Sequence, residues 1–375
     1  MATAPLTSSI SAGFTSSTQS STISTSTQSS TMSTTMSTTS SPETSPSVTN
    51  FLSIKLDRTN YALWLAQILD KIAPYLQILD LGSIHYFLGV EASYDGPVLY
   101  LTQKKYIVDL LHRTNMHEVK PCTTRAPSGQ KLSLYDGEKL SDPSEYRSVV
   151  GALQYLTLTR PDISYSVNQV CKFMHCPTTV HWTAVKRILL YLKYSIHHGL
   201  KYQPGSLFIS AYSDADYAGD PDNRQSTGGY CVYLGPNLIS WSSKTHKTVS
   251  RSSAEAEYRQ LAFTAAEISW NEAMFCDLSL FLQCPTIWSD NLSAIAIASN
   301  PVFHARTKHV EVDYHYVREK VVNKELQVLF VSTTDQVADT FCKGLSSSRF
   351  HFLVSKLPVL PRPLSLRGSD KPIIN

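Results

Sequence analysis

Three short runs of alternating apolar and polar residues follow one another after Gly205, and this pattern constrains the fold more than any other feature of the chain. The runs are SLFISAYSDADYAG, STGGYCVYLG and NLISWSSKTHKTVS, and Gly235, Pro236 and Asn237 join the last two. Alternation with a period of two is typical of β-strands, and Gly, Pro and Asn are typical of turns. The stretch therefore predicts an antiparallel three-stranded meander.

Helices and strands alternate after the meander. SSAEAEYRQLAFTAAEISWNEAMFCDL reads as a long helix that Ser252 or Ser253 can cap. PTIWSD and ELQVLFVS read as short strands, and NLSAIAIAS, HVEVDYHYVREKVVN and TDQVADTFCKGL read as helices. Three antiparallel strands and two strands that alternate with helices form one mixed sheet. Residues 205–345 are therefore predicted to be an α/β domain with a five-stranded mixed sheet and flanking helices.

Residues 78–204 predict a hairpin followed by a mostly helical region. GSIHYFLGVEASYDGPVLYLTQKKYIVDLLHRTNM reads as strand, turn at Asp95-Gly96-Pro97, strand and helix, with Thr102 as the helix N-cap. A long polar loop follows. Three helices then come from SEYRSVVGALQYLTLT, which stops before Arg160-Pro161, and from PDISYSVNQVCKFMH and TTVHWTAVKRILLYLKYS.

The first fifty residues differ in composition from the rest. Thirty-one of them are Ser or Thr, none is Lys or Arg, and Glu43 is the only acid. Such a segment has too little apolar surface to offset its ordering entropy, so we expect it to be disordered. It has neither the basic and apolar regions of a signal peptide nor the arginines of a mitochondrial transit peptide. Residues 51–77 then predict a short amphipathic helix, and residues 346–375 are assigned to a C-terminal tail.

Charge and cysteine content narrow the class of protein. The 33 basic and 30 acidic side chains give a net charge of +3, which is too small to indicate nucleic-acid binding by itself. The seven cysteines are odd in number and form no C-x-x-C pair, which favours reduced thiols over a disulfide frame or zinc ribbon. No apolar run approaches the ~18 residues of a membrane span. We therefore expect an intracellular protein of the cytoplasm or nucleus.

Four acidic residues come from four different predicted elements of residues 205–345. Asp214 lies near the end of the first strand, Glu257 in the long helix, Asp290 at the end of the fourth strand and Asp339 in the last helix. Ligands gather at the edge where strands end in such sheets. Converging carboxylates bind hard divalent cations, and two ions roughly 4 Å apart can activate a water for phosphodiester cleavage. The sequence predicts a site for two Mg²⁺ or Mn²⁺ ions, with these acids as catalytic and metal-binding residues.

Three of these acids, Asp214, Glu257 and Asp339, have a neighbour that leaves the assignment open. Asp216 shares a strand face with Asp214, so either could be the ligand. Glu255 and Glu257 lie two apart on a helix and point differently, so only one is expected to face the site. Asp335 and Asp339 are spaced for one helix face, and Asp335 could simply cap that helix.

Basic residues suggest where a phosphate backbone could bind. HARTKHVEVDYHYVRE carries histidines that are not spaced as a zinc site, and it reads either as a solvated helix face or as a backbone-contacting surface. The six residues assigned to nucleic-acid binding are Arg306, Lys308, His309, Arg318, Lys186 and Arg187.

Several motifs resemble the polyprotein of copia-type long-terminal-repeat retrotransposons from plants, over nearly everything after residue 50. YSDADYAGDPDNRQSTGGYCVYLG, ISWSSKTHKTVSRSSAEAEYRQLA, WSDNLSAIAIASNPVFHARTKHVEVDYHYVRE and QVADTFCKGL are similar, in order, to blocks of its ribonuclease H domain. LGSIHYFLGV, LTQKKYIVDLL, YRSVVGALQYLTLTRPDISYSVNQV and HWTAVKRILLYLK resemble the C-terminal part of its reverse transcriptase, and SIKLDRTNYALWLAQIL resembles the start of its Gag region.

The resemblance implies a ribonuclease H-like fold for residues 205–345, with Asp214, Glu257, Asp290 and Asp339 as the four metal-binding acids. It implies hydrolysis of the RNA strand of RNA–DNA hybrids, with nucleic acid as partner, no membrane and no small-molecule cofactor. The chain lacks the Tyr-x-Asp-Asp motif of the polymerase and any protease or integrase segment, so it reads as a truncated element without polymerase activity.

Other departures from the family pattern support an alternative function. His246, Gln260 and Cys342 stand where other residues are expected, and VSTTDQVAD lacks the histidine that many ribonucleases H carry before the last helix. The alternative is a catalytically inactive relic that at most binds nucleic acid.

Overall fold

A computed structural model describes residues 84–127, 129, 131–299 and 311–362. The segments expected to be disordered (1–50) and Gag-like (51–77) lie outside this range. In the described part, no helix combines the length and apolar character needed to cross a membrane.

The predicted five-stranded mixed sheet with flanking helices is confirmed. Its strand order is β7-β6-β5-β8-β9, with antiparallel pairing from β7 to β5 and parallel pairing from β5 to β9. The strands are β5 (Ile209–Asp216), β6 (Thr227–Leu234), β7 (Asn237–Thr245), β8 (Thr286–Ser289) and β9 (Gln327–Phe330). The helices are α7 (Ser253–Asp277), α8 (Leu292–Ser299), α9 (Glu311–Val322) and α10 (Asp339–Cys342), with a 3₁₀ turn η4 at Thr333–Asp335.

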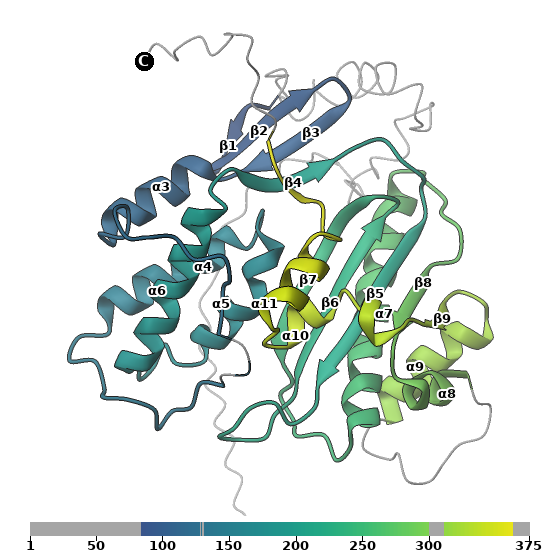
Figure 1. Ribbon diagram of the computed structural model, residues 1–375. Helices are drawn as coiled ribbons and strands as arrows, with labels where there is room; N and C mark the ends of the chain where they lie inside the picture. The colour runs from purple at the N-terminus through teal and green to yellow at the C-terminus, as the bar shows by residue number, and fades with distance from the viewer. Residues whose placement is uncertain (1–83, 128, 130, 300–310, 363–375) are drawn as a thin grey trace, which may run out of the picture. The chain divides into compact units, whose positions relative to one another are not determined.

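Successive side chains of β6 point to opposite faces of the sheet, and both faces are covered. Val232 packs with residues of α7, α8 and α9 on one face, while its neighbours Cys231 and Tyr233 pack with Phe341 of α10 on the other. Figure 1 shows α7 behind the sheet and the yellow helices in front of it. A strand buried on both faces in this way is held in a single register.

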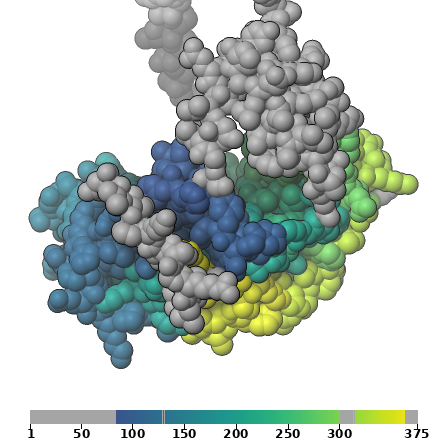
Figure 2. Space-filling view, turned by 90° about the horizontal axis from the view of Figure 1, so that it is seen from above, coloured from purple at the N-terminus to yellow at the C-terminus, as the bar shows by residue number. Residues whose placement is uncertain are grey.

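A second sheet was only partly predicted. The hairpin of β2 (Val90–Asp95) and β3 (Val98–Thr102) is present, but it belongs to a five-stranded antiparallel sheet of order β1-β2-β3-β4-β10. The added strands are β1 (Tyr86–Phe87), β4 (His198–Tyr202) and β10 (Val359–Pro361). Figure 2 shows blue residues from the start of the described chain next to yellow residues from its end.

The segment assigned to a C-terminal tail contains regular structure. Helix α11 (Ser347–Val354) brings Phe350 into one core cluster, and β10 brings Val359 into another. The Thr102 cap assignment is wrong, because Thr102 ends β3 and the N-cap of the next helix is Gln103, whose side chain makes no capping bond.

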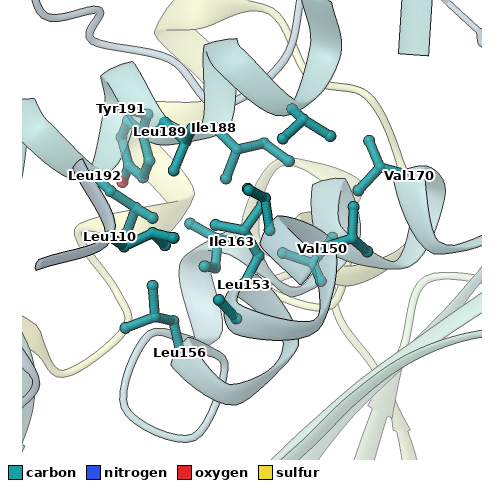
Figure 3. Close-up of a cluster of buried hydrophobic side chains, with 14 of the residues drawn as sticks. Leu110, Val150, Leu153, Leu156, Ile163, Val170, Ile188, Leu189, Tyr191 and Leu192 are labelled. Carbon is teal, nitrogen blue, oxygen red and sulfur yellow. The ribbon is translucent and has the colours of Figure 1, made fainter. Parts of the chain in front are cut away.

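Four helices and a 3₁₀ turn form the helical region. They are α3 (Lys104–Arg113), α4 (Ser144–Leu156), η2 (Pro161–Ile163), α5 (Ser164–Cys171) and α6 (Thr179–Tyr194). Leu153 and Leu156 of α4 meet Ile188 of α6 and Ile163 in one fully buried cluster, as Figure 3 shows. The apolar spacing of the predicted helices therefore corresponds to a real core.

Candidate metal centre

The position of Asp214 follows from its place near the end of β5. Its Cα lies opposite Gly229 on β6, and its side chain is fully buried. A Cβ built on Gly229 would lie 2.6 Å from Phe341 Cβ and 2.8 Å from the Phe341 carbonyl carbon. Only glycine at this point lets α10 approach the sheet so closely, and that approach brings Asp339 to Asp214.

Parallel pairing positions Asp290. Strands β5 and β8 run parallel, and Tyr212 pairs with Trp288. Asp214 and Asp290 each come two residues later in their own segment, so both reach the same end of the sheet. Glu257 comes from the first turns of α7, which starts at the Ser252 cap, where the Ser252 side chain accepts from the Glu255 backbone N–H. Three separate segments thus bring their acids to the edge that was expected to collect ligands.

The four predicted acids form two potential ligand groups that share Asp214. One group is Asp214, Glu257 and Asp290, and the other is Asp214, Asp339 and Cys342. In each group, one ligand atom per residue lies within 4.8 Å of the others. Asp214 is thus the one residue common to both groups.

The neighbouring acids have other partners. Asp216 lies 3.8 Å from Lys131 Nζ, and Glu255 forms an ion pair of 3.0 Å with Arg259. Neither belongs to a potential ligand group among the described residues. The structure thus places Asp214 and Glu257 in the ligand groups, and not Asp216 or Glu255.

The expectation that Asp335 and Asp339 share one helix face is wrong. Asp335 ends the 3₁₀ turn, Asp339 starts α10, and the extended backbone at Gln336 separates the two. The buried Gln336 side chain fixes this break by donating to the Ser213 carbonyl oxygen at 3.1 Å. Asp335 pairs with Lys356 at 2.5 Å, and the cap of the turn is Ser332.

Glu257 carries the clearest sign that the site is suited to a cation. Its side chain is only 6% exposed, and its Oε2 atom has no hydrogen-bond partner. Burial, together with the Asp214 carboxylate, raises the pKa of Glu257. An unpaired buried carboxylate oxygen is costly unless a charge partner satisfies it, and a divalent ion reverses such a pKa shift. The group of Asp214, Glu257 and Asp290 offers only hard carboxylate oxygens and therefore fits Mg²⁺ or Mn²⁺, whereas the other group includes the Cys342 sulfur.

Replacing Glu257 with Gln is expected to stabilise the metal-free protein at pH 8, by about 0.5–2 kcal/mol. The folded-state pKa of Glu257 lies above its unfolded value of about 4.3, so ionising it in the folded state costs stability. That cost grows as the pH rises above about 4.3 and vanishes below it, where both states are protonated. Urea unfolding in EDTA at pH 8 and pH 5 measures the effect.

The exposed Glu319, changed to Gln, is the matched control and should have little effect at either pH. An equal gain from Glu257→Gln at both pH values would contradict the electrostatic explanation, because a packing effect would not depend on pH.

Curated relatives match most of the chain. A retrovirus-related Pol polyprotein from transposon RE1 of Arabidopsis thaliana is 50% identical over 299 residues, which cover 79% of this chain and 20% of that protein. One from transposon TNT 1-94 of Nicotiana tabacum is 35% identical over 297 residues, covering 76% and 22%. A putative transposon Ty5-1 protein of Saccharomyces cerevisiae is 31% identical over 227 residues, covering 58% of this chain and 73% of that protein.

The chain belongs to the retrovirus-related transposon polyproteins. This confirms the expected family at the level of a retrotransposon polyprotein. The chain spans about one fifth of the length of the two plant polyproteins. No protein-family model matches the sequence.

Solved ribonucleases H align with part of this polyprotein chain. Ribonuclease H1 of Halobacterium salinarum NRC-1 aligns with a TM-score of 0.28 and 13% identity, covering 36% of this chain and 93% of that one. LC11-RNase H1, solved in complex with an RNA/DNA hybrid, aligns with a TM-score of 0.29 and 17% identity, covering 36% and 93%. Alignments with such low scores do not decide the fold, which rests on the strand order of the polyprotein chain itself.

Of the six basic residues expected to bind nucleic acid, only Lys186, Arg187 and Arg318 lie among the described residues. Arg306, Lys308 and His309 lie outside the described residues. Lys186 and Arg187 lie on α6 and line a cavity of about 460 Å³ together with Arg125 and Lys131, and no acid of the metal centre lines it. Arg187 donates to the Thr124 hydroxyl at 2.7 Å. Arg318 lies on α9 and already takes part in an interaction within the protein.

Three residues at the acidic cluster of this chain were given no role in the sequence analysis. Lys343 Nζ lies 2.9 Å from an oxygen of Asp214 and 2.9 Å from one of Asp339, and Arg349 Nη2 lies 3.1 Å from the other Asp339 oxygen. The Cys342 thiol donates to Asp214 Oδ2. The i, i+4 spacing of Asp339 and Lys343 is a signal that could have predicted that pair, whereas Arg349 fell in the supposed tail.

Two of the unusual substitutions contact each other. His246 Nε2 lies 3.2 Å from Gln260 Oε1, both side chains are buried, and burial lowers the pKa of His246. Gly228 leaves room for the pair, since a Cβ there would lie 1.9 Å from the Gln260 oxygen. These residues therefore form a packed polar pair inside the domain.

Proposed function

We propose that the chain is a metal-dependent endonuclease that hydrolyses the RNA strand of RNA–DNA hybrids. The observation that carries the proposal is the pair of ligand groups sharing Asp214, one of which contains the unpaired oxygen of Glu257. The membership among retrovirus-related polyproteins and the resemblance of these blocks to a ribonuclease H domain support it. We further propose that the chain is a truncated copia-type element whose ribonuclease domain is residues 205–345, preceded by a reverse-transcriptase remnant without polymerase activity.

The roles of the acids follow from their geometry. Two divalent ions, when bound, would activate the attacking water and stabilise the departing 3′ oxygen. Asp214 would hold both ions because it belongs to both groups, with Glu257 and Asp290 on one side and Asp339 on the other. The buried carboxylates would be held rigidly, since Asp214 and Glu257 are almost inaccessible to solvent.

Recognition of the substrate would come mainly from its shape and backbone. The 2′-hydroxyl and the minor-groove width distinguish an RNA–DNA hybrid from duplex DNA. We propose Arg306, Lys308, His309 and Arg318 as backbone contacts near the site, from their place in the sequence, and Lys186 and Arg187 as contacts of the remnant. Such contacts position the duplex without reading its sequence.

A second candidate is an inactive relic that binds nucleic acid without cutting it. The observation in its favour is that Lys343 and Arg349 already neutralise Asp339 and part of Asp214. A site neutralised by its own side chains would bind a divalent ion less tightly.

The deciding experiment is a cleavage assay on the purified full chain with an RNA–DNA hybrid labelled on the RNA strand. We expect cuts within the RNA strand in Mg²⁺ or Mn²⁺, none with excess EDTA, and none in matched duplex DNA or duplex RNA. Cleavage that persists in EDTA would exclude metal catalysis. Binding of the hybrid without cleavage in either metal would favour the relic.

A further inference from the structure

The two halves of the metal centre differ in how their charge is balanced. In the half formed by Asp214 and Asp339, Lys343 Nζ lies 3.1 Å from Asp214 Oδ1, 2.9 Å from Asp214 Oδ2 and 2.9 Å from Asp339 Oδ1. Arg349 Nη2 lies 3.1 Å from Asp339 Oδ2. Every carboxylate oxygen of this half therefore has a cationic donor.

The two acids that belong only to the other half, Glu257 and Asp290, have no such partner. Among the described residues, neither Glu257 nor Asp290 forms an ion pair within 4.0 Å, and Glu257 Oε2 lacks any hydrogen-bond partner. An entering divalent ion gains most where the fewest carboxylates are already paired. In the group of Asp214, Glu257 and Asp290, only Asp214 has a cationic partner, whereas both Asp214 and Asp339 have one in the other group. The Glu257 side of the centre is therefore the more favourable place for a first ion.

The position of Lys343 also allows it to leave. Its side chain is 32% exposed, so its ammonium can move on its flexible stem toward solvent while the stem stays packed. Asp339 and Lys343 lie at the two ends of the short helix α10, and the backbone N–H of Lys343 donates to the Asp339 carbonyl oxygen at 3.1 Å. A rotation of the Lys343 side chain alone would remove the ammonium from both Asp214 oxygens and from Asp339 Oδ1, while Arg349 keeps its contact with Asp339 Oδ2 and the fold does not change.

We propose that Lys343 is a built-in cation of the Asp214–Asp339 half, so that divalent ions bind in a fixed order. The first ion binds at Asp214, Glu257 and Asp290, and a second enters beside Asp339 only when the Lys343 ammonium moves away. This inference rests on the proposed metal-dependent function. A substrate phosphate near the cluster would give the displaced ammonium a new partner, so hybrid binding would favour the second ion.

Binding of Mn²⁺ to the full chain without nucleic acid tests the order, by calorimetry and by the electron paramagnetic resonance of free Mn²⁺. Mn²⁺ prefers the same oxygen ligands as Mg²⁺. The wild-type chain should bind one ion tightly and a second at least about tenfold more weakly. Lys343→Met keeps the length of the side chain and removes its charge, and it should tighten the second site by at least about tenfold.

Lys320→Met is the matched control. Lys320 is also partly buried and forms an ion pair with Glu325 at 3.3 Å, but it lies on α9 and, in the part of the chain that the structure describes, pairs with no acid of the centre. It should leave both binding constants unchanged. Glu257→Gln provides an independent test that needs no change at Lys343, because it should remove the tight ion and leave the weak one.

The outcomes separate this inference from the proposed function. Two ions of equal affinity in the wild-type chain, or a second site that Lys343→Met does not tighten, would overturn the role of Lys343 even if the chain cuts hybrids. Ordered binding in a chain that cuts no hybrid would support the role of Lys343 and reject the proposed function.

Discussion

Asparagine in place of Asp214 is expected to abolish hybrid cleavage, by at least about a thousandfold in rate, while the chain stays folded. Asp214 is the one residue common to both ligand groups, so the change weakens both ion sites together. Removing one transition-state stabilising group alone costs about 10²–10³ in rate, and this residue serves two. The amide has nearly the volume of the carboxylate, so packing against α10 is preserved.

Asp290→Asn tests one ligand group by itself, because Asp290 belongs only to the group with Asp214 and Glu257. It should also abolish measurable cleavage, and it could tighten hybrid binding by relieving repulsion with phosphate. Single-turnover cleavage rates and hybrid binding of each variant give the measurement, and Asp277→Asn, at an exposed position near the end of α7, is the control. Wild-type rates in Asp214→Asn would show that the acidic cluster is not the catalytic site.

The sequence contained enough information for the central sheet and its acids. Alternation in β5, β6 and β7 predicts the meander, and the position of Asp290 directly after a short buried strand predicts that it reaches the edge where Asp214 ends its strand. Both inferences are local, since they need only the period of the pattern and the parallel direction of one strand pair.

The missed features depend on contacts between distant parts of the chain. Strand β10 has three residues and pairs with β4 about 160 positions earlier, so no local period could reveal it. Arg349 reaches Asp339 only because α11 folds back over α10. The buried Arg125 is similar, because it donates to the Asp162 carbonyl oxygen and, at 2.6 Å, to the Thr340 carbonyl oxygen beside Asp339. From sequence alone an arginine is expected to be exposed to solvent, and only the tertiary structure shows that Arg125 is buried.

Arg160 illustrates the same difficulty. Next to Pro161 it reads as the end of a helix, which is correct, since α4 ends at Leu156. In the structure its side chain is 0% exposed and makes a two-pronged pair with Asp162, with Nε to Oδ1 at 2.9 Å and Nη2 to Oδ2 at 2.7 Å. Ser195 accepts from the same guanidinium, and the Tyr191 hydroxyl donates to Asp162 Oδ2 at 2.6 Å.

Replacing Asp162 with Asn should therefore destabilise the helical region by about 3–5 kcal/mol, because Arg160 is left charged and buried without its partner. That is a large part of the total of about 5–15 kcal/mol that holds a typical domain folded. The matched double variant Arg160→Met with Asp162→Leu removes both charges and should recover most of the loss. Urea unfolding midpoints, with hydrogen exchange of α4 and α6, measure both effects, and Asp109→Asn at an exposed position of α3 is the control.

The pH dependence identifies the cause of the loss. Burial alone raises the pKa of Asp162, but the charge and hydrogen bonds of Arg160 outweigh it and hold the pKa below its ordinary value. A carboxylate with a lowered folded-state pKa contributes its stability above the unfolded value of about 3.9, and loses it as the pH falls below that value. The difference between wild type and Asp162→Asn should therefore be full at pH 7 and shrink below about pH 4. A difference that stays constant down to pH 3, or a double variant as unstable as the single one, would show that shape rather than charge makes Asp162 necessary.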